Sequence, residues 1–195
     1  MNRELRWLIL LVALLSAALL SNGCIDEGPT ATPTAPLPSA ATSPSPVPPE
    51  FQLRISSPEF AQGARIPARF TCDGNDINPA LRIENVPAGT KTLALILEDP
   101  DAPGGTWVHW VVYDIPVTIG INEDSVPGMQ GRNDYGVIRY RGPCPPSGTH
   151  RYVFTLYALD TELGLGEGVE QAALVRVLQG HILATAELSG YYSHE

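Results

Sequence analysis

The chain has 195 residues, with 12 Lys and Arg against 21 Asp and Glu, which gives a formal net charge of −9. Residues 51–195 carry 10 of the basic and 17 of the acidic side chains, and this length suits one domain. An acidic surface repels the phosphates of nucleic acid, so we expect no nucleic-acid partner. An anion would have to be held by local donors in a small recessed site.

The N-terminus has the pattern of an export signal. Arg3 and Arg6 precede the apolar run 7–20, which is too short for an ordinary transmembrane span, and small residues follow before Cys24. This placement resembles a lipoprotein cleavage site, which predicts a signal peptide over 1–23 and lipidation of Cys24. A secretory peptide cut nearby and an uncleaved anchor are the alternatives. All three place the rest of the chain outside the cytoplasm.

Residues 24–50 are rich in Pro, Thr and Ser, with eight prolines and few large apolar side chains. Such a composition cannot bury enough apolar surface to form a core and is typical of an extended linker. We therefore predict a tether over 24–50 that connects the membrane to a domain over 51–195.

The domain reads mainly as β-strands. The residues 93–98 form a short apolar run, and the residues 107–115 and 152–159 combine aromatic and β-branched side chains. Helical spacing over 169–179 predicts one helix with Val169, Ala173, Leu174, Val177 and Leu178 on one face. Alternation returns over 182–188 as a last strand. This order predicts two packed antiparallel sheets with a helix outside.

Two proline-stiffened segments carry the polar groups that suggest a site. The first runs from Asp99 through Trp107 to His109, and the second, over 142–152, ends in His150-Arg151-Tyr152. Alternation along a strand would place His109 on one face with Trp107, Val111 and Tyr113. In the same way it places His150 and Tyr152 on one face and Arg151 on the other. We expect Arg151 to brace the loops by pairing with Asp99 or Asp101.

These motifs, D-P-D-A-P, W-x-H and G-P-x-P-P-x-G-x-H-R-Y, resemble those of the phosphatidylethanolamine-binding protein family. The stretch 70–81 and the turn Asn133-Asp134-Tyr135-Gly136 resemble its bacterial and archaeal, Raf-kinase-inhibitor-like branch. The resemblance implies a β-sandwich of a large central sheet and a smaller sheet, with a ligand pocket at one end. The residues it implies at the pocket are Asp99, Pro103, Trp107, His109, Pro145, His150 and Tyr152. It gives no role to Tyr191 and Tyr192, which follow the last predicted strand.

The three cysteines suggest a division of roles. We hypothesise that Cys24 carries lipid and that Cys72 and Cys144 form a disulfide beside the pocket, as exported proteins commonly do. The alternatives are two free thiols, or a nucleophilic Cys144 with His150 as its base.

A binding function fits these residues best. Imidazolium groups, the Tyr152 hydroxyl and loop amides could hold a phosphate or phosphoethanolamine-like group, with Asp99 keeping a histidine protonated, and no cofactor or metal is expected. The family also includes protease inhibitors, which implies an extracytoplasmic protein partner. A hydrolase using Asp99, His109 and His150, with or without metal, is the main alternative, and a structural surface-layer protein is the third.

Overall fold

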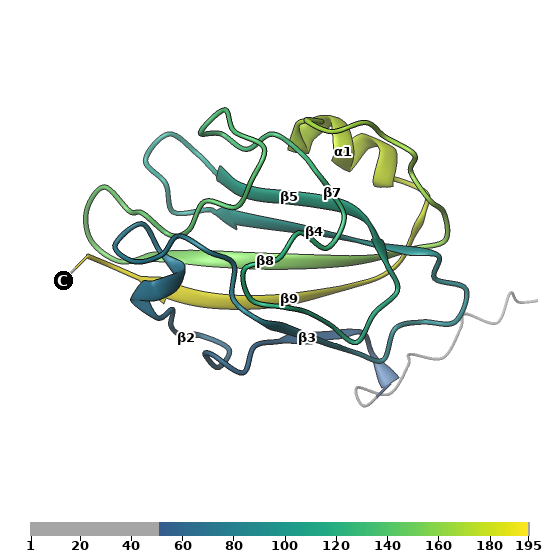
Figure 1. Cartoon of the computed structure of the whole chain (residues 1–195), viewed down its shortest axis with the longest axis horizontal. Helices are drawn as coiled ribbons and strands as arrows, with labels where there is room; N and C mark the ends of the chain where they lie inside the picture. Colours follow the sequence, from purple (N-terminus) through teal and green to yellow (C-terminus); the bar gives the residue numbers. More distant parts are fainter. Residues whose placement is uncertain (1–50, 195) are drawn as a thin grey trace, which may run out of the picture. The chain divides into compact units, whose positions relative to one another are not determined.

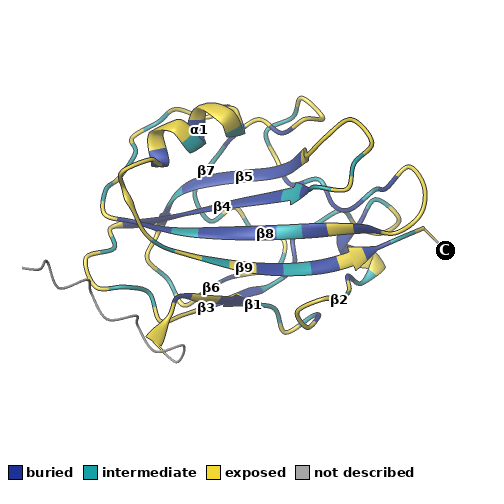
Figure 2. Cartoon of the chain, turned by 180° about the vertical axis from the view of Figure 1, so that it is seen from behind, coloured by how far each residue is buried: buried dark blue, intermediate teal, exposed yellow. Residues whose placement is uncertain are grey.

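The computed structural model describes residues 51–194, and within them the chain forms two β-sheets and one α-helix. The large sheet has the strand order β2-β9-β8-β4-β5-β7, and the small sheet has the order β1-β3-β6. Figures 1 and 2 show the helix α1 and the small sheet on opposite sides of the large sheet. The expected mainly β architecture, with a large sheet, a smaller sheet and an outer helix, is confirmed.

The strands of the large sheet are β2 (Ala64–Arg65), β4 (Thr92–Asp99), β5 (Trp107–Pro116), β7 (Met129–Gln130), β8 (His150–Leu159) and β9 (Ile182–Tyr192). Those of the small sheet are β1 (Arg54–Ser56), β3 (Leu81–Glu84) and β6 (Gly120–Ile121). Neighbouring strands are antiparallel except for the parallel pair of β2 and β9. The predicted runs at 93–98, 107–115 and 152–159 therefore correspond to β4, β5 and β8.

Two apolar clusters hold these layers together. The larger lies between the sheets and includes Leu95 and Leu97 of β4, Trp110 of β5 and Phe154 of β8. Successive side chains of a strand point to opposite faces, so the alternate residues of β4 form a second cluster with Leu174. Because β4 is covered on both faces, its sequence is a continuous apolar run. Figure 2 shows the resulting burial of the central strands.

The helix α1 (Gln171–Leu178) is shorter than the predicted range and buries a narrower face. Leu174 and Leu178 are buried, whereas Ala173 is exposed and Val177 is 40% exposed. Val169 precedes the helix, so the five apolar residues predicted on one face do not form a single buried stripe. A helix that lies on the outside of a sheet contacts it along one line, which an i, i+4 pair is sufficient to cover.

The last strand is longer than predicted. β9 continues through Tyr192, pairing with β8 as far as His150 and with Arg65 of β2 at Tyr191. The expectation that Tyr191 and Tyr192 follow the strand was therefore wrong. Tyr192 is buried and Tyr191 is 41% exposed, as the alternation of a paired strand requires.

The predicted signal peptide, the Cys24 lipidation site and the whole predicted tether lie outside the described residues. Within residues 51–194 the structure contains no helix that combines the length and apolar character needed to cross a bilayer. Cys72 and Cys144, which are 72 positions apart, are joined by a disulfide with a Cα–Cα distance of 5.5 Å. It links the loop after the 3-10 helix Ala68–Phe70 to the proline-rich loop before β8.

Candidate functional site

The Asp99-Pro100-Asp101 turn leads from β4 toward β5 and is hydrogen-bonded to the start of β8. Asp99 Oδ1 accepts a hydrogen bond from the backbone N–H of Asp101 at 2.9 Å, and Asp101 Oδ2 accepts one from the backbone N–H of Arg151 at 2.8 Å. Pro100 fixes its own φ, and the Asp99 side chain closes the turn over it. The turn therefore holds the first residues of β8 at a set position.

His150 is held by the other oxygen of the same carboxylate. Its Nδ1 lies 2.8 Å from Asp99 Oδ2, and both side chains are buried. Asp99 accepts, so Nδ1 carries the proton and the Nε2 edge of the ring is left for another partner. His150 and Tyr152 are buried while Arg151 is exposed, which is the alternation predicted for this strand.

Arg151 does not have the predicted role. Its contact with Asp101 is made by the backbone N–H, and none of the ion pairs recorded for residues 51–194 involves its guanidinium. The side chain instead borders a hollow of about 410 Å³ together with Glu98, Thr155 and Gln171. Alternation places it on the face of β8 opposite His150, so pairing with Asp99, which bonds His150, was the wrong expectation.

His109 sits in a β-bulge. Leu97 of β4 pairs with Trp110 and Glu98 pairs with Val108, so His109 is an additional residue of β5 between these two pairs. The bulge interrupts the alternation, which is why Val111 joins the cluster under α1 whereas the His109 ring contacts Tyr152 on the other face. The prediction that His109 shares a face with Val111 and Tyr113 was therefore wrong.

The His109 ring is fixed in one orientation. Its Nδ1 donates to the backbone carbonyl of Arg141 at 2.8 Å, while its own backbone carbonyl accepts from Asn133 Nδ2 at 3.0 Å. Burial lowers the pKa of His109, and the Arg141 carbonyl and the charge of Asp99 offset this only in part. The neutral imidazole therefore prevails at neutral pH and its Nε2 is a hydrogen-bond acceptor, which corrects the expectation of two imidazolium groups.

Tyr152 provides the third polar group. Its ring meets the His109 ring edge to face with centroids 5.2 Å apart, and the residue has no exposed surface. Burial, followed by the charge of Asp99, raises the pKa of the Tyr152 phenol far above its usual value. Asp99 and the Cys144 backbone are near enough to affect the pKa of this hydroxyl, but neither has hydrogen-bond geometry to it. The Tyr152 hydroxyl is therefore buried without a hydrogen-bond partner. Its proton is therefore available to a bound group.

Tyr135 is a member of this cluster that the sequence reasoning did not select. Its ring lies 5.5 Å from the rings of both Trp107 and His109, and the guanidinium carbon of Arg141 is 5.2 Å from its centroid. Tyr135 and Trp107 are 37% and 39% exposed, so they separate His109 from solvent. The sequence did mark the position of Tyr135, because this residue lies in the family turn motif Asn133-Asp134-Tyr135-Gly136. In that turn Asn133 Oδ1 accepts a hydrogen bond from the Tyr135 N–H at 3.1 Å.

The two prolines predicted at the pocket differ in burial: Pro145 is buried and Pro103 is exposed. Glycine is needed at Gly142 in the same proline-rich loop as Pro145, because a Cβ there would lie 2.1 Å from the Phe70 carbonyl oxygen. This close contact places the loop directly on the segment that carries Cys72.

A metal centre at Asp99, His109 and His150, the residues of the hydrolase alternative, receives no support. Among residues 51–194, the group of three donors within 4.8 Å of one another consists of Cys72, Cys144 and His194, not of Asp99, His109 and His150. A nucleophilic Cys144 is also contradicted, since its sulfur is bonded to Cys72.

Comparisons with known proteins identify the family of this chain. Residues 56–193 match the family model described as "Phosphatidylethanolamine-binding protein". A protein of Methanothermobacter thermautotrophicus described as "UPF0098 protein" is 45% identical over 148 residues, covering 72% of this chain and 98% of that protein. An Aquifex aeolicus protein with the same description is 46% identical over 153 residues, covering 73% and 90%.

Two solved structures are similar in fold and sequence. The Chlamydia trachomatis protein CT736, described as a putative phosphatidylethanolamine-binding protein homologue, superposes with a TM-score of 0.73 at 41% identity, covering 74% of this chain and 99% of that chain. YbcL of E. coli, described as a new member of the mammalian family of the same name, gives a TM-score of 0.69 at 31% identity, covering 74% and 99%.

Proposed function

Since this chain belongs to the phosphatidylethanolamine-binding protein family, we propose that it is a binding protein that takes a phosphate or phosphoethanolamine-like group at Asp99, His109, His150 and Tyr152. The observation that carries the proposal is the buried Tyr152 hydroxyl, which has no hydrogen-bond partner while two histidines are oriented beside it. Buried polar groups without partners are rare, and they are satisfied when a ligand supplies the partner.

Each side chain has a distinct task in this proposal. The Tyr152 hydroxyl donates to a phosphoryl oxygen, and His150 presents its Nε2 edge while Asp99 holds Nδ1. His109 is neutral before binding, so it either accepts from a protonated phosphate oxygen at Nε2 or takes up a proton as the anion arrives. Charge-assisted hydrogen bonds of this kind contribute about 1.5 to 3 kcal/mol each.

The route to this cluster passes two aromatic rings. Trp107 and Tyr135 are partly exposed and pack edge to face against each other, and Tyr135 also packs edge to face against His109. Rotation of these rings admits the anion. The hollow bordered by Arg151 lies on the other face of β8 and is separate from this route.

Calorimetric titration of the full chain tests the anion site. Inorganic phosphate and phosphoethanolamine should bind and acetate should bind less, and a ligand at 100 times its dissociation constant should add about 2.7 kcal/mol to stability. His150→Asn should weaken binding at least about tenfold, because asparagine places no polar group at the position of Nε2. His181→Asn is the matched control, because His181 also pairs with a carboxylate, Asp160, at 2.8 Å but is exposed.

Two outcomes would reject the anion site: no heat or stabilisation with any of the three anions, or equal binding by the His150 and His181 variants. The hydrolase alternative has its own outcome. Turnover of a phosphodiester or carboxylic ester that is lost in His109→Ala, with or without sensitivity to a chelator, would replace a binding function by a catalytic one.

The proposal includes an extracytoplasmic location with Cys24 lipidated and residues 24–50 as a tether. The apolar run before Cys24 supports it, as does the Cys72–Cys144 disulfide, since disulfides persist in oxidising compartments. Cys24→Ser should move the protein from the membrane to the soluble fraction, and mass spectrometry of the mature N-terminus should find an acyl chain. An unmodified Cys24 would refute the lipid anchor. Inhibition of an external protease is a further proposal, tested with the soluble domain against serine proteases.

A further inference from the structure

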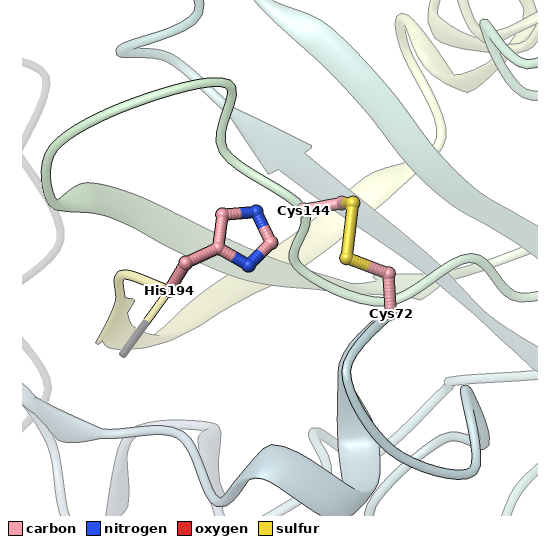
Figure 3. Close-up of side chains that lie close together, drawn as sticks. All are labelled: Cys72, Cys144 and His194. Atoms are coloured by element: carbon pink, nitrogen blue, oxygen red, sulfur yellow. A yellow bond between two sulfur atoms is a disulfide. The ribbon is translucent and has the colours of Figure 1, made fainter.

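Three potential metal ligands meet beyond the end of β9. The sulfurs of Cys72 and Cys144 and a ring nitrogen of His194 all lie within 4.8 Å of one another, and Figure 3 shows them arriving from three separate segments of the chain. Tetrahedral zinc with bonds of about 2.3 Å to sulfur and about 2.0 Å to nitrogen needs its ligand atoms roughly 3.5 to 3.8 Å apart. The His194 nitrogen thus lies near both sulfurs, but the sulfurs are bonded to each other, so reduction must first separate them before both can bind one ion.

A carboxylate orients the histidine. His194 Nδ1 lies 2.6 Å from Asp73 Oδ2, and the same oxygen accepts from the Tyr192 hydroxyl at 2.7 Å. With Nδ1 donating to Asp73, Nε2 is the nitrogen left to bind a metal. A carboxylate on the far nitrogen is the usual support of a zinc-bound histidine, because it fixes the tautomer and the ring orientation.

The loops that carry the cysteines are also joined by bonds other than the disulfide. The Cys72 N–H donates to the Pro143 carbonyl at 3.1 Å, and the Gly142 N–H donates to Asp76 Oδ1 at 2.6 Å. The guanidinium of Arg141 pairs with Asp76 Oδ2 at 2.8 Å. These bonds join the two loops independently of the disulfide, so we expect the loops to stay together when the sulfurs separate.

We propose that the thiol-reduced form of this chain binds one Zn²⁺ through Cys72 Sγ, Cys144 Sγ and His194 Nε2, with Asp73 as the positioning residue. A dithiol reductant supplies two electrons to the disulfide: the sulfur–sulfur bond breaks, and the reductant becomes a disulfide. The two cysteine thiols release their protons to solvent when the ion binds as a thiolate complex. Three protein ligands leave the fourth position to water. The disulfide form would bind no zinc, so the redox state of the two cysteines would control the site.

The test uses the full chain with Cys24→Ser, which leaves Cys72 and Cys144 as the remaining cysteines. The protein is reduced with a dithiol, freed of it without air, and titrated with Zn²⁺ against a chromophoric chelator. One equivalent should bind to the reduced protein and none to the oxidised protein at the same chelator strength. Cobalt in place of zinc should give the visible absorption of a tetrahedral thiolate site, and mild oxidation should abolish it.

Variants distinguish this site from ordinary thiol binding. Asp73→Asn should lower zinc affinity about 10- to 100-fold while keeping the thiolate spectrum, and His194→Ala should lower it further. His181→Ala is the matched control and should not change affinity, because its Asp160-bound ring belongs to another part of the chain. The proposal is overturned if the reduced protein binds no more tightly than a Cys72→Ser/Cys144→Ser variant. It is also overturned if reduction unfolds the chain so that Asp73→Asn and His194→Ala bind zinc as the control does.

Discussion

Replacing Tyr152 by phenylalanine tests the central feature of the candidate site. The hydroxyl is fully buried and has no hydrogen-bond partner, so it has lost its water without compensation. A buried hydroxyl in this position costs about 1 to 3 kcal/mol, and Tyr152→Phe keeps the ring and its contact with His109. We therefore expect the free protein to become more stable by about 1 to 2 kcal/mol, while its affinity for phosphate falls at least about tenfold.

The measurement is a urea or thermal unfolding curve with and without phosphate. For a domain of this size each kcal/mol corresponds to roughly 3 to 5 °C in melting temperature. Tyr140→Phe provides the matched control, since Tyr140 is also buried but its hydroxyl donates to the Phe70 carbonyl at 2.8 Å. That substitution leaves a carbonyl without its partner and should destabilise the protein by about 1 kcal/mol.

The two variants thus move stability in opposite directions, and only the change at Tyr152 weakens phosphate binding. If Tyr152→Phe destabilises the protein as much as Tyr140→Phe does, the Tyr152 hydroxyl has a partner in the folded protein and the reasoning is refuted. If it stabilises the protein but leaves phosphate affinity unchanged, the hydroxyl does not contact the anion.

Three further predictions concern the same region. Burial lowers the pKa of His109 from 6.5 in the folded protein, so below that pH the unfolded chain binds more protons than the folded one. The free energy of unfolding should therefore fall as the pH drops through the folded pKa. In unfolding curves measured over a pH series, His109→Asn should make this fall smaller. The disulfide closes a loop of 72 positions, so the double variant Cys72→Ala/Cys144→Ala should lower the free energy of unfolding by about 4 kcal/mol in denaturant titrations. A loss below about 1 kcal/mol would contradict the loop-entropy estimate. Gly142→Ala should cost about 1 to 3 kcal/mol in the same titration, because its Cβ would meet the Phe70 carbonyl, and an unchanged midpoint would mean that the loop moves freely.

Local patterns in the sequence determined several parts of this protein. The continuous apolar run of β4 is buried on both faces, and the alternation at the start of β8 places His150 and Tyr152 inside with Arg151 outside. These outcomes depend on a period of two residues and on burial, which neighbouring residues specify by themselves. The family motifs were recognised for the same reason, since they are short and continuous.

Only the tertiary structure decided the chemistry of His109. Its face is set by a bulge, which exists only relative to the pairing register of β4, and its pKa is lowered because the ring is enclosed by groups distant in the chain. The contact with Tyr135 and the reach of β9 to Tyr192 likewise depend on partners supplied by other segments. Sequence periodicity fixes which side chains can share a face, whereas the pairing of distant strands and loops fixes which of them meet and in which protonation state.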